Sequence, residues 1–262
     1  MGIAVRTIGA YAQELLREGA TAVVVARTSR ALFLAVEGEM VWVSAPAFPH
    51  RRALLAARPP VWPEGLVLHV EGRALLDGAH EPLHLGGAAV WSAPALPPPP
   101  PDLARRAHAL ARPFAPALAH AHRGLGAARV AAVQEALRAG DGPGLAAAAR
   151  NLLGCGPGLT PLGDDFLGGV FFALRAARCP WWPGEVPAFL AWARARTPRL
   201  SHALLADLSQ GHGPEPLHAL TLALFTGAVR EAQLRACDLL GIGQSTGAGL
   251  LAGVLAVWSA LS

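Results

Sequence analysis

The residues best placed to do chemistry lie between Leu153 and Gly169, in the segment LGCGPGLTPLGDDFLGG. Its glycines Gly154, Gly156 and Gly158 predict a loop whose backbone takes left-handed turns and approaches a ligand closely. Two adjacent carboxylates follow the loop within the same segment. The combination is typical of a site that binds an anion, with a metal ion as a possible companion.

A helix is predicted to begin directly after this loop. Thr160 offers an N-cap hydroxyl, Pro161 suits the first helical position, and an apolar run continues to Leu174. A helix N-terminus presents unbonded N–H groups and the positive end of a dipole, which favour phosphate or carboxylate. We therefore expect a small anionic substrate to be bound by Gly154, Gly156, Gly158, Leu159 and Thr160.

The acidic pair in the first helical turn has two interpretations. Asp164 and Asp165 would hold Mg²⁺, which often takes one or two carboxylates together with phosphate oxygens. Because adjacent helical side chains point about 100° apart, both reach one ion only if the turn is irregular. Alternatively, the carboxylates offset the helix dipole and the glycines allow close helix packing.

Other chemistries are less well supported in this segment. Cys155 is either a nucleophile, activated at a helix N-terminus, or a small residue that fits a tight turn. No Lys follows the last glycine of the loop, so it is not a P-loop, and no strand-like run precedes it as in dinucleotide-binding proteins. The chain has no G-x-S-x-G motif, which disfavours hydrolases of that class.

A second glycine loop repeats the pattern G-x-G-x-[ST]. It reads GIGQS from Gly241, as the first loop reads GPGLT from Gly156, and each hydroxyl residue precedes a helical glycine, Gly168 or Gly253. We expect both hydroxyls to cap helices whose N-termini converge on one anionic ligand. The second loop would contribute Gly243, Gln244, Ser245 and Thr246. The alternative is coincidence in a chain with 29 glycines.

The composition narrows the class of protein. The 262 residues suffice for one large domain or two small ones. All 22 basic residues are Arg, the net charge is +4, and the densest Arg cluster (194–199) has no interleaved aromatic platform, so no nucleic-acid partner is expected.

A single Asn and many prolines suit a thermophile. Three cysteines without CxxC spacing, and no signal peptide, predict a cytoplasmic protein.

The C-terminal region is uncharged from Leu239 onward, which on length alone would allow a membrane span. Its first part is the polar glycine loop, however, and leaves only about 14 residues of apolar helix. Gly249 and Gly253 form a GxxxG pair, which also marks close helix contact in water-soluble proteins. We expect a buried helix and no membrane association, with a tail anchor as the alternative.

The predicted fold is α+β, with a β-rich domain over residues 1–96 and a mainly α-helical domain over 102–262. After an opening helix over 9–18, β-branched or apolar runs indicate a small antiparallel barrel or sandwich. The prolines at 97–101 break this pattern and behave as a stiff spacer. Beyond them, Ala, Leu and Arg recur at helical spacing, which predicts a compact helical domain carrying both glycine loops.

The segment GCGPGLTPLGDDFLGG, Gly154 to Gly169, resembles the signature of a bacterial domain-of-unknown-function family that includes the AllH-type subunit of oxamate carbamoyltransferase. The similarity extends over most of the chain, with a looser match at Gly241–Gly247. The resemblance implies carbamoyl transfer between carbamoyl phosphate and oxamate, in purine- or allantoin-derived nitrogen metabolism. It also implies partner enzyme subunits or a homo-oligomer.

The resemblance further implies roles for individual residues. Amides of Gly156–Leu159 and the Thr160 hydroxyl would hold a phosphate, and a nearby Arg would pair with the substrate carboxylate. Asp164 or Asp165 would be catalytic, by binding Mg²⁺ or orienting the attacking amide. The Ser-Thr-Arg-Thr loop of transcarbamoylases is absent, so that fold is not implied. The alternative function is a non-catalytic protein that binds small anions or serves as a scaffold.

Overall fold

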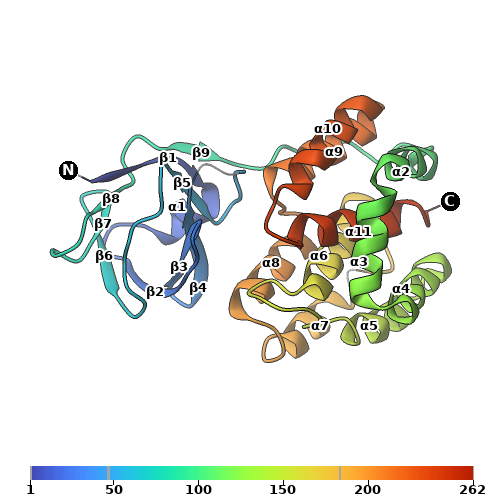
Figure 1. The fold of residues 1–262 in the computed structure, drawn as a ribbon, viewed down its shortest axis with the longest axis horizontal. Helices are drawn as coiled ribbons and strands as arrows, with labels where there is room; N and C mark the ends of the chain where they lie inside the picture. Colours follow the sequence, from blue (N-terminus) through green and yellow to red (C-terminus); the bar gives the residue numbers. More distant parts are fainter. Residues whose placement is uncertain (1, 46–47, 183, 262) are drawn as a thin grey trace. The chain divides into compact units, whose positions relative to one another are not determined.

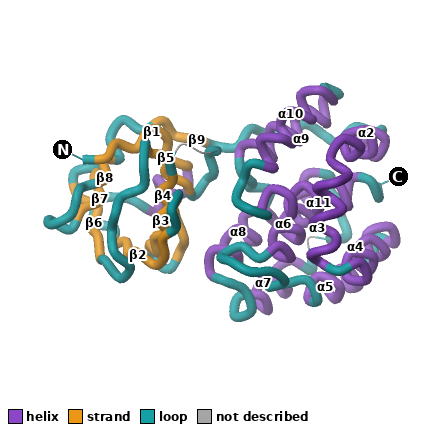
Figure 2. The backbone as a smooth tube through the Cα atoms, viewed as in Figure 1, coloured by secondary structure: helices purple, strands orange, loops and turns teal. Residues whose placement is uncertain are grey.

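The strands lie in the first part of the chain, together with one short helix, and the other helices follow them (Figures 1 and 2). The computed structural model describes residues 2–45, 48–182 and 184–261. It divides into two compact units, Met1–Pro94, which carries the strands, and Ala95–Ser262, which is helical. The α+β fold class expected from the sequence is therefore confirmed.

The first unit is a sheet that closes on itself into a small barrel. Along the ring the strands follow the order β5-β4-β3-β2-β6-β7-β8-β1, a pairing between β1 and β5 closes it, and β9 pairs with β1. The strands are β1 (Ile3–Gly9), β2 (Thr21–Arg27), β3 (Ala31–Val36), β4 (Glu39–Ser44), β5 (Ala53–Ala56), β6 (Val67–Glu71), β7 (Ala74–Leu76), β8 (Leu83–His84) and β9 (Ala89–Trp91).

Two details of this unit differ from the sequence prediction. The sheet is mixed, not antiparallel, because β4–β5, β1–β8 and β1–β9 are parallel pairs. Strand β1 also precedes the helix α1 (Ala10–Leu15), so the prediction that a helix opens the chain is wrong. The parallel pairs join strands that no hairpin connects, and local sequence patterns do not reveal such pairs.

The interior of the ring is apolar. Strand β3 shows the rule, since Leu32, Leu34 and Val36 are buried while the residues between them are only half-buried. Alternate side chains of a strand point to opposite faces, so a period of two places one set inside. Trp62, which lies outside the strands, is also fully buried in this core, and its Nε1 donates to the Glu81 carbonyl at 3.2 Å.

The second unit is built from short helices around one apolar core. The helical spacing of Ala, Leu and Arg beyond the prolines predicts this helical unit, and the structure confirms it. The elements are α2 (Leu103–Ala111), η1 (Arg112–Phe114), α3 (Ala115–Leu125), α4 (Ala127–Ala139), α5 (Gly142–Arg150), α6 (Leu162–Ala176), α7 (Val186–Ala193), α8 (Arg199–Ser209), α9 (Glu215–Thr226), α10 (Val229–Leu240) and α11 (Thr246–Trp258).

Helices α6 and α11 form the centre of this unit and pack tightly on one another. Their contact depends on glycine: a Cβ at Gly249 would lie 2.7 Å from the Cβ of Asp165, and one at Gly253 would lie 2.8 Å from the Val170 nitrogen. Helix α11 is buried as expected. Among the described residues, no helix is long and apolar enough to cross a membrane.

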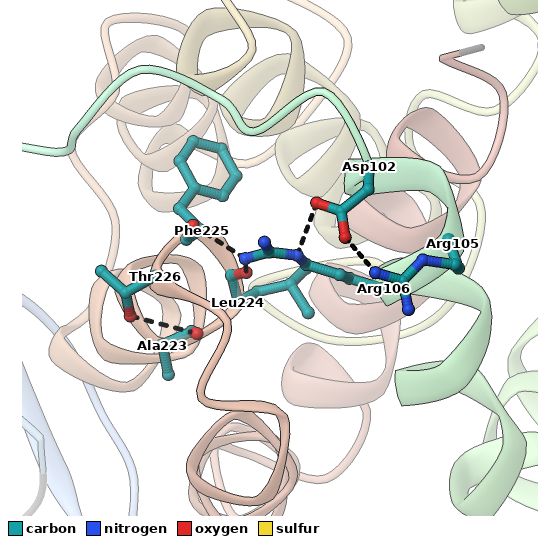
Figure 3. Close-up of polar contacts among 7 residues, drawn as sticks. All are labelled: Asp102, Arg105, Arg106, Ala223, Leu224, Phe225 and Thr226. Atoms are coloured by element: carbon teal, nitrogen blue, oxygen red, sulfur yellow. Dashed lines mark hydrogen bonds and ion pairs between the residues drawn. The ribbon is translucent and has the colours of Figure 1, made fainter.

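An arginine clasp joins α2 to the end of α9 (Figure 3). The Nη1 of Arg106 donates to the carbonyls of Leu224 and Phe225, both at 2.9 Å, and its Nε lies 2.7 Å from Asp102 Oδ1. The carbonyls at a helix C-terminus lack intrahelical donors, so a cationic side chain is well placed there. The clasp therefore caps α9 with a residue distant in sequence.

Candidate anion site at two glycine loops

The first glycine loop has the backbone that its sequence predicts. Gly154, Gly156 and Gly158 have φ values of 73°, 116° and 96°, in the left-handed region that favours glycine. Leu159 is 38% exposed beside them. Within the described ranges, the N–H groups of Gly156, Gly158 and Leu159 donate no hydrogen bond to the protein. They remain available to a ligand.

Asp164 anchors this loop. Its Oδ1 accepts a 2.6 Å hydrogen bond from the Gly154 N–H, and its Oδ2 accepts from the hydroxyls of Thr197 and Ser201. The Ser201 bond is 2.6 Å long, and the carboxyl group is almost fully buried. Burial of such a group is tolerated because donors surround both oxygens. Asp164 thus fixes the loop to the start of α8.

Thr160 does not act as the helix cap that the sequence predicts. Pro161 occupies the N-cap position of α6, and no side chain caps the helix. The Thr160 hydroxyl instead lies 2.9 Å from that of Thr246, the first residue of α11. The physical reason is that the Thr246 hydroxyl competes with the N–H groups of α6 for the Thr160 hydroxyl. The contact also brings together the two loops that the sequence predicts to converge.

The second loop presents a similar edge. Gly243 is left-handed, with φ of 60°, and Gln244 is exposed. Ser245 stands at the N-cap position of α11 but its side chain makes no capping bond, so the predicted cap is wrong here as well. In the described part of the chain, the N–H groups of Gly243, Gln244 and Ser245 donate to no protein acceptor. Two sets of available N–H groups therefore flank the Thr160–Thr246 contact.

Asp165 lies beside this contact in an environment unlike that of Asp164. It is 5% exposed, and its Oδ2 has no hydrogen-bond partner among the described residues. Burial raises the pKa of Asp165 to about 8, against the opposing effect of hydrogen bonds from Thr246 and Thr160; the nearby Asp164 raises the pKa further. At pH 7 Asp165 is therefore mostly a neutral carboxylic acid.

The prediction that Asp164 and Asp165 bind Mg²⁺ depends on which of their oxygens are available. The described residues contain no group of three or more His, Cys, Asp and Glu side chains able to hold a metal ion. Both oxygens of Asp164 already accept hydrogen bonds, whereas Asp165 has one oxygen without a partner and a pKa raised to about 8. Of the two carboxylates, only Asp165 has an oxygen to offer, and an ion would have to displace its proton.

A cationic platform beside the first loop escaped the sequence analysis. The guanidinium of Arg196 lies 4.6 Å from the centre of the Trp192 ring, and that of Arg150 lies 5.6 Å from it. The prediction that the Arg cluster at 194–199 has no aromatic platform is therefore wrong. Trp192 and Arg196 are four residues apart, a spacing that places side chains together on a helix and was visible in the sequence. Arg150 comes from α5 and was not.

The platform adjoins the glycine loop. A Cβ added at Gly154 would lie 3.3 Å from the carbonyl oxygen of Arg196, and Arg150 ends the helix that leads into the loop. Within the described ranges, neither guanidinium has a carboxylate partner. Stacking on an aromatic face leaves the edge of a guanidinium open to a carboxylate or phosphate. In Arg196 one nitrogen, Nη1, already donates to the Trp192 carbonyl at 2.7 Å, and the other nitrogens remain for a ligand.

Cys155 takes part in the loop through its backbone. Its N–H donates to the Leu152 carbonyl at 3.0 Å, and its own carbonyl accepts from the Gly163 N–H at 2.8 Å. The thiol is half-buried and its Sγ lies 3.5 Å from the Asn151 carbonyl. These contacts explain a small residue at this position without assigning the thiol a chemical role.

Comparison with known proteins gives one match. Residues 152–258 match the family model of oxamate carbamoyltransferase subunit AllH. This span contains both glycine loops and the helices α6 to α11, and it confirms the resemblance read from the first loop. The closed sheet lies outside the matched residues, although the resemblance was expected to cover most of the chain. No curated protein and no solved structure matches the chain.

Proposed function

We propose that the chain is a subunit of a carbamoyltransferase-type enzyme that binds a small anionic, phosphate-bearing substrate at the two glycine loops. One observation carries the proposal: two loops with available N–H groups meet at the Thr160–Thr246 contact, inside the span matched by the AllH family. Backbone N–H groups at helix N-termini are suited to phosphate, because they supply donors and a positive dipole end.

The charges around the loops agree with an anionic ligand. Arg150 and Arg196 flank the first loop and would pair with a carboxylate or phosphate. Asp165 would repel an anion if it were ionised, but its raised pKa keeps it neutral near pH 7. In carbamoyl transfer, the donors would stabilise the phosphate as it leaves and the negative charge that develops on it.

The two carboxylates have different parts in this proposal. Asp164 acts as a positioning residue, because it fixes Gly154 through its side chain. Asp165 is the candidate for contact with substrate or Mg²⁺, since one of its oxygens is unpartnered. If Mg²⁺ binds there, it competes with the proton, so its affinity should rise as the pH increases toward 9.

Partners and location follow from the same proposal. A subunit of a carbamoyltransferase requires other subunits, or copies of itself, for the complete reaction. We place the protein in the cytoplasm, where its three free cysteines would remain reduced.

Calorimetric titration of the purified chain with carbamoyl phosphate, inorganic phosphate and oxamate tests the proposal. We expect saturable binding of the phosphate-bearing ligands, weakened about tenfold in Arg196→Gln by the loss of a charged hydrogen bond. Arg194→Gln is the matched control, since Arg194 lies in the same segment but does not stack on Trp192. The Thr160→Val and Thr246→Val variants should weaken binding as well.

Two outcomes would redirect the proposal. If none of the three ligands binds saturably, the loops are not the substrate site. If phosphate binds as predicted, but the chain supports no carbamoyl transfer when combined with its partner subunits, then the protein is a non-catalytic anion-binding or scaffolding component.

A further inference from the structure

A cavity of about 370 Å³ lies in the helical unit, away from the glycine loops. Its walls come from α2, α3, α4 and the C-terminal half of α11, and each of the first three helices contacts α11. Leu255 lines the cavity, whereas Thr246 marks the loop end of the same helix, about 14 Å away at 1.5 Å per residue. The volume is within the range of small-molecule sites.

Part of the cavity lining is apolar. Ala252, Leu255 and Ala256 of α11 contribute to it, together with Ala111 of α2 and Leu118 of α3. Several of these side chains are alanines, and their small size leaves the space open. An apolar wall of this kind stabilises a ligand by removing its hydrocarbon surface from water.

The remaining lining residues include polar side chains that offer hydrogen-bond donors. Among them are His108, His122, Gln134 and Arg138, and no carboxylate is among the lining residues of the cavity. Arg138 is exposed and has no ion-pair partner in the part of the chain that the structure describes. Partial burial lowers the pKa of His122, which therefore contributes a neutral ring at pH 7.

These basic side chains also have an ordinary structural explanation. His108, His122 and Arg138 each lie in the last turn of a helix, where basic groups offset the dipole. That effect accounts for one basic residue at the end of each helix. It does not require three of them, from three helices, to line a single cavity whose lining is otherwise largely apolar.

We propose that this cavity binds a small molecule with an apolar body and a carboxylate head group. The apolar body lies against α11, and the carboxylate accepts hydrogen bonds from Arg138, Gln134 and His122. The lining contains no anionic group to repel the head, and Arg138 supplies a permanent positive charge. This site is separate from the anion site proposed at the glycine loops.

Titration of the intact chain with hexanoate, hexanol and acetate, followed by calorimetry, tests this proposal. We expect hexanoate to bind saturably and about tenfold more tightly than either comparison compound, because only hexanoate has both the apolar body and the charged head. Arg138→Gln should abolish that advantage. Arg123→Gln is the matched control, since Arg123 lies in the last turn of α3 but does not line the cavity.

Filling the cavity provides a second test. Ala256→Leu should block hexanoate while leaving the binding of inorganic phosphate at the loops unchanged. If this variant does not fold, Ala111→Leu fills the cavity from α2 instead. The proposal is overturned if hexanoate does not bind saturably, if hexanol binds as tightly, or if binding survives in a folded cavity-filling variant. Failure of phosphate binding alone would concern the loop site and not this one.

Discussion

Asp164 and Asp165 are neighbours in the sequence but have opposite surroundings. Three donors hold the Asp164 carboxylate in place, whereas Asp165 keeps one oxygen without a partner in an apolar setting. Adjacent residues on a helix point in directions about 100° apart, so one faces α8 and the loop while the other faces α11. The pair is therefore not a symmetric ligand set, and each residue is best tested separately.

The stability of the protein should depend on the protonation of Asp165. Its pKa is about 8 in the folded chain and near 3.8 when unfolded, so between these values the folded state binds the extra proton. The contribution of Asp165 to the free energy of unfolding is then greatest below about pH 4, and it is lost as the pH rises toward 8. Compared with Asp165→Asn, the wild type should lose about 1.4 kcal/mol per pH unit across this window. Urea unfolding at several pH values measures this, and parallel profiles would contradict it.

The anchoring role of Asp164 predicts a local effect. Asp164→Ala removes the acceptor oxygens, so the Gly154 N–H should exchange with solvent much faster than in the wild type. Gly144 offers an internal control, because its N–H donates at 2.9 Å to Asp141 Oδ1 in the same kind of contact. Hydrogen exchange followed residue by residue measures both. Equal acceleration at the two glycines would indicate general destabilisation instead.

At the residue scale, the sequence predicts which residues belong to the site, but it does not predict which side chains they bind. The left-handed glycines were predictable, because only glycine takes that backbone freely. The Thr160 hydroxyl was assigned to a local cap, yet it binds Thr246 from a loop far along the chain. Thr197 and Ser201, the partners of Asp164, have no distinguishing local pattern. Long-range partners of this kind depend on the packing of helices.

At the scale of elements, the contact between α6 and α11 determines how closely the two loops approach. Both helices carry glycines on the contact face, and both begin at a glycine loop. Close helix packing, the structural explanation of the glycines, therefore applies to Gly169, Gly249 and Gly253. It does not exclude the functional one, because close packing of the helices also brings their N-termini together.

Gly253→Ala should be strongly destabilising. The new Cβ would lie 2.8 Å from the Val170 nitrogen and 2.9 Å from the Gly169 Cα, and this backbone cannot move without separating the helices. We expect a loss of about 1–3 kcal/mol, despite the better helix propensity of Ala. Gly124→Ala on α3 is the matched control, since its Cβ meets only the tip of the Leu162 side chain. A folded Gly253→Ala variant of unchanged stability in urea would refute this packing.

The contact of Arg106 with the end of α9 should also contribute to the stability of the helical unit. Arg106→Met removes the donor to the Leu224 and Phe225 carbonyls and should cost about 1–3 kcal/mol (Figure 3). Arg105→Met should cost much less, because Arg105 contacts the same Asp102 but is largely exposed. Thermal unfolding of both variants measures the difference. Equal losses would show that the ion pair with Asp102, and not the helix cap, is the stabilising contact.

The predictability of elements differs between the two units. Helices follow from a period of 3.6 residues within one segment, so local pattern is enough to predict the helical character of the second unit. Strands β1 and β5 pair with each other and close the ring, yet neither has a pattern that identifies its partner. Parallel pairs such as β1–β8 are also invisible to turn chemistry, because no hairpin joins them.

At the scale of the whole molecule, the two units have separate cores and different relations to known proteins. The span matched by the AllH family lies entirely in the helical unit, as do both glycine loops. The binding site proposed at those loops therefore needs no residue of the closed sheet. That separation can be tested with fragments of the chain.

We expect residues 95–262 to fold alone, to unfold cooperatively, and to bind inorganic phosphate as the full chain does. The sequence predicts a domain that starts at Asp102, but Leu96 already packs on the helical core. A fragment over 102–262 should therefore be less stable than one over 95–262 by about 1 kcal/mol, the value of burying part of a leucine side chain. Circular dichroism during urea unfolding compares the two. Non-cooperative unfolding of the longer fragment would show that the helical unit depends on the sheet.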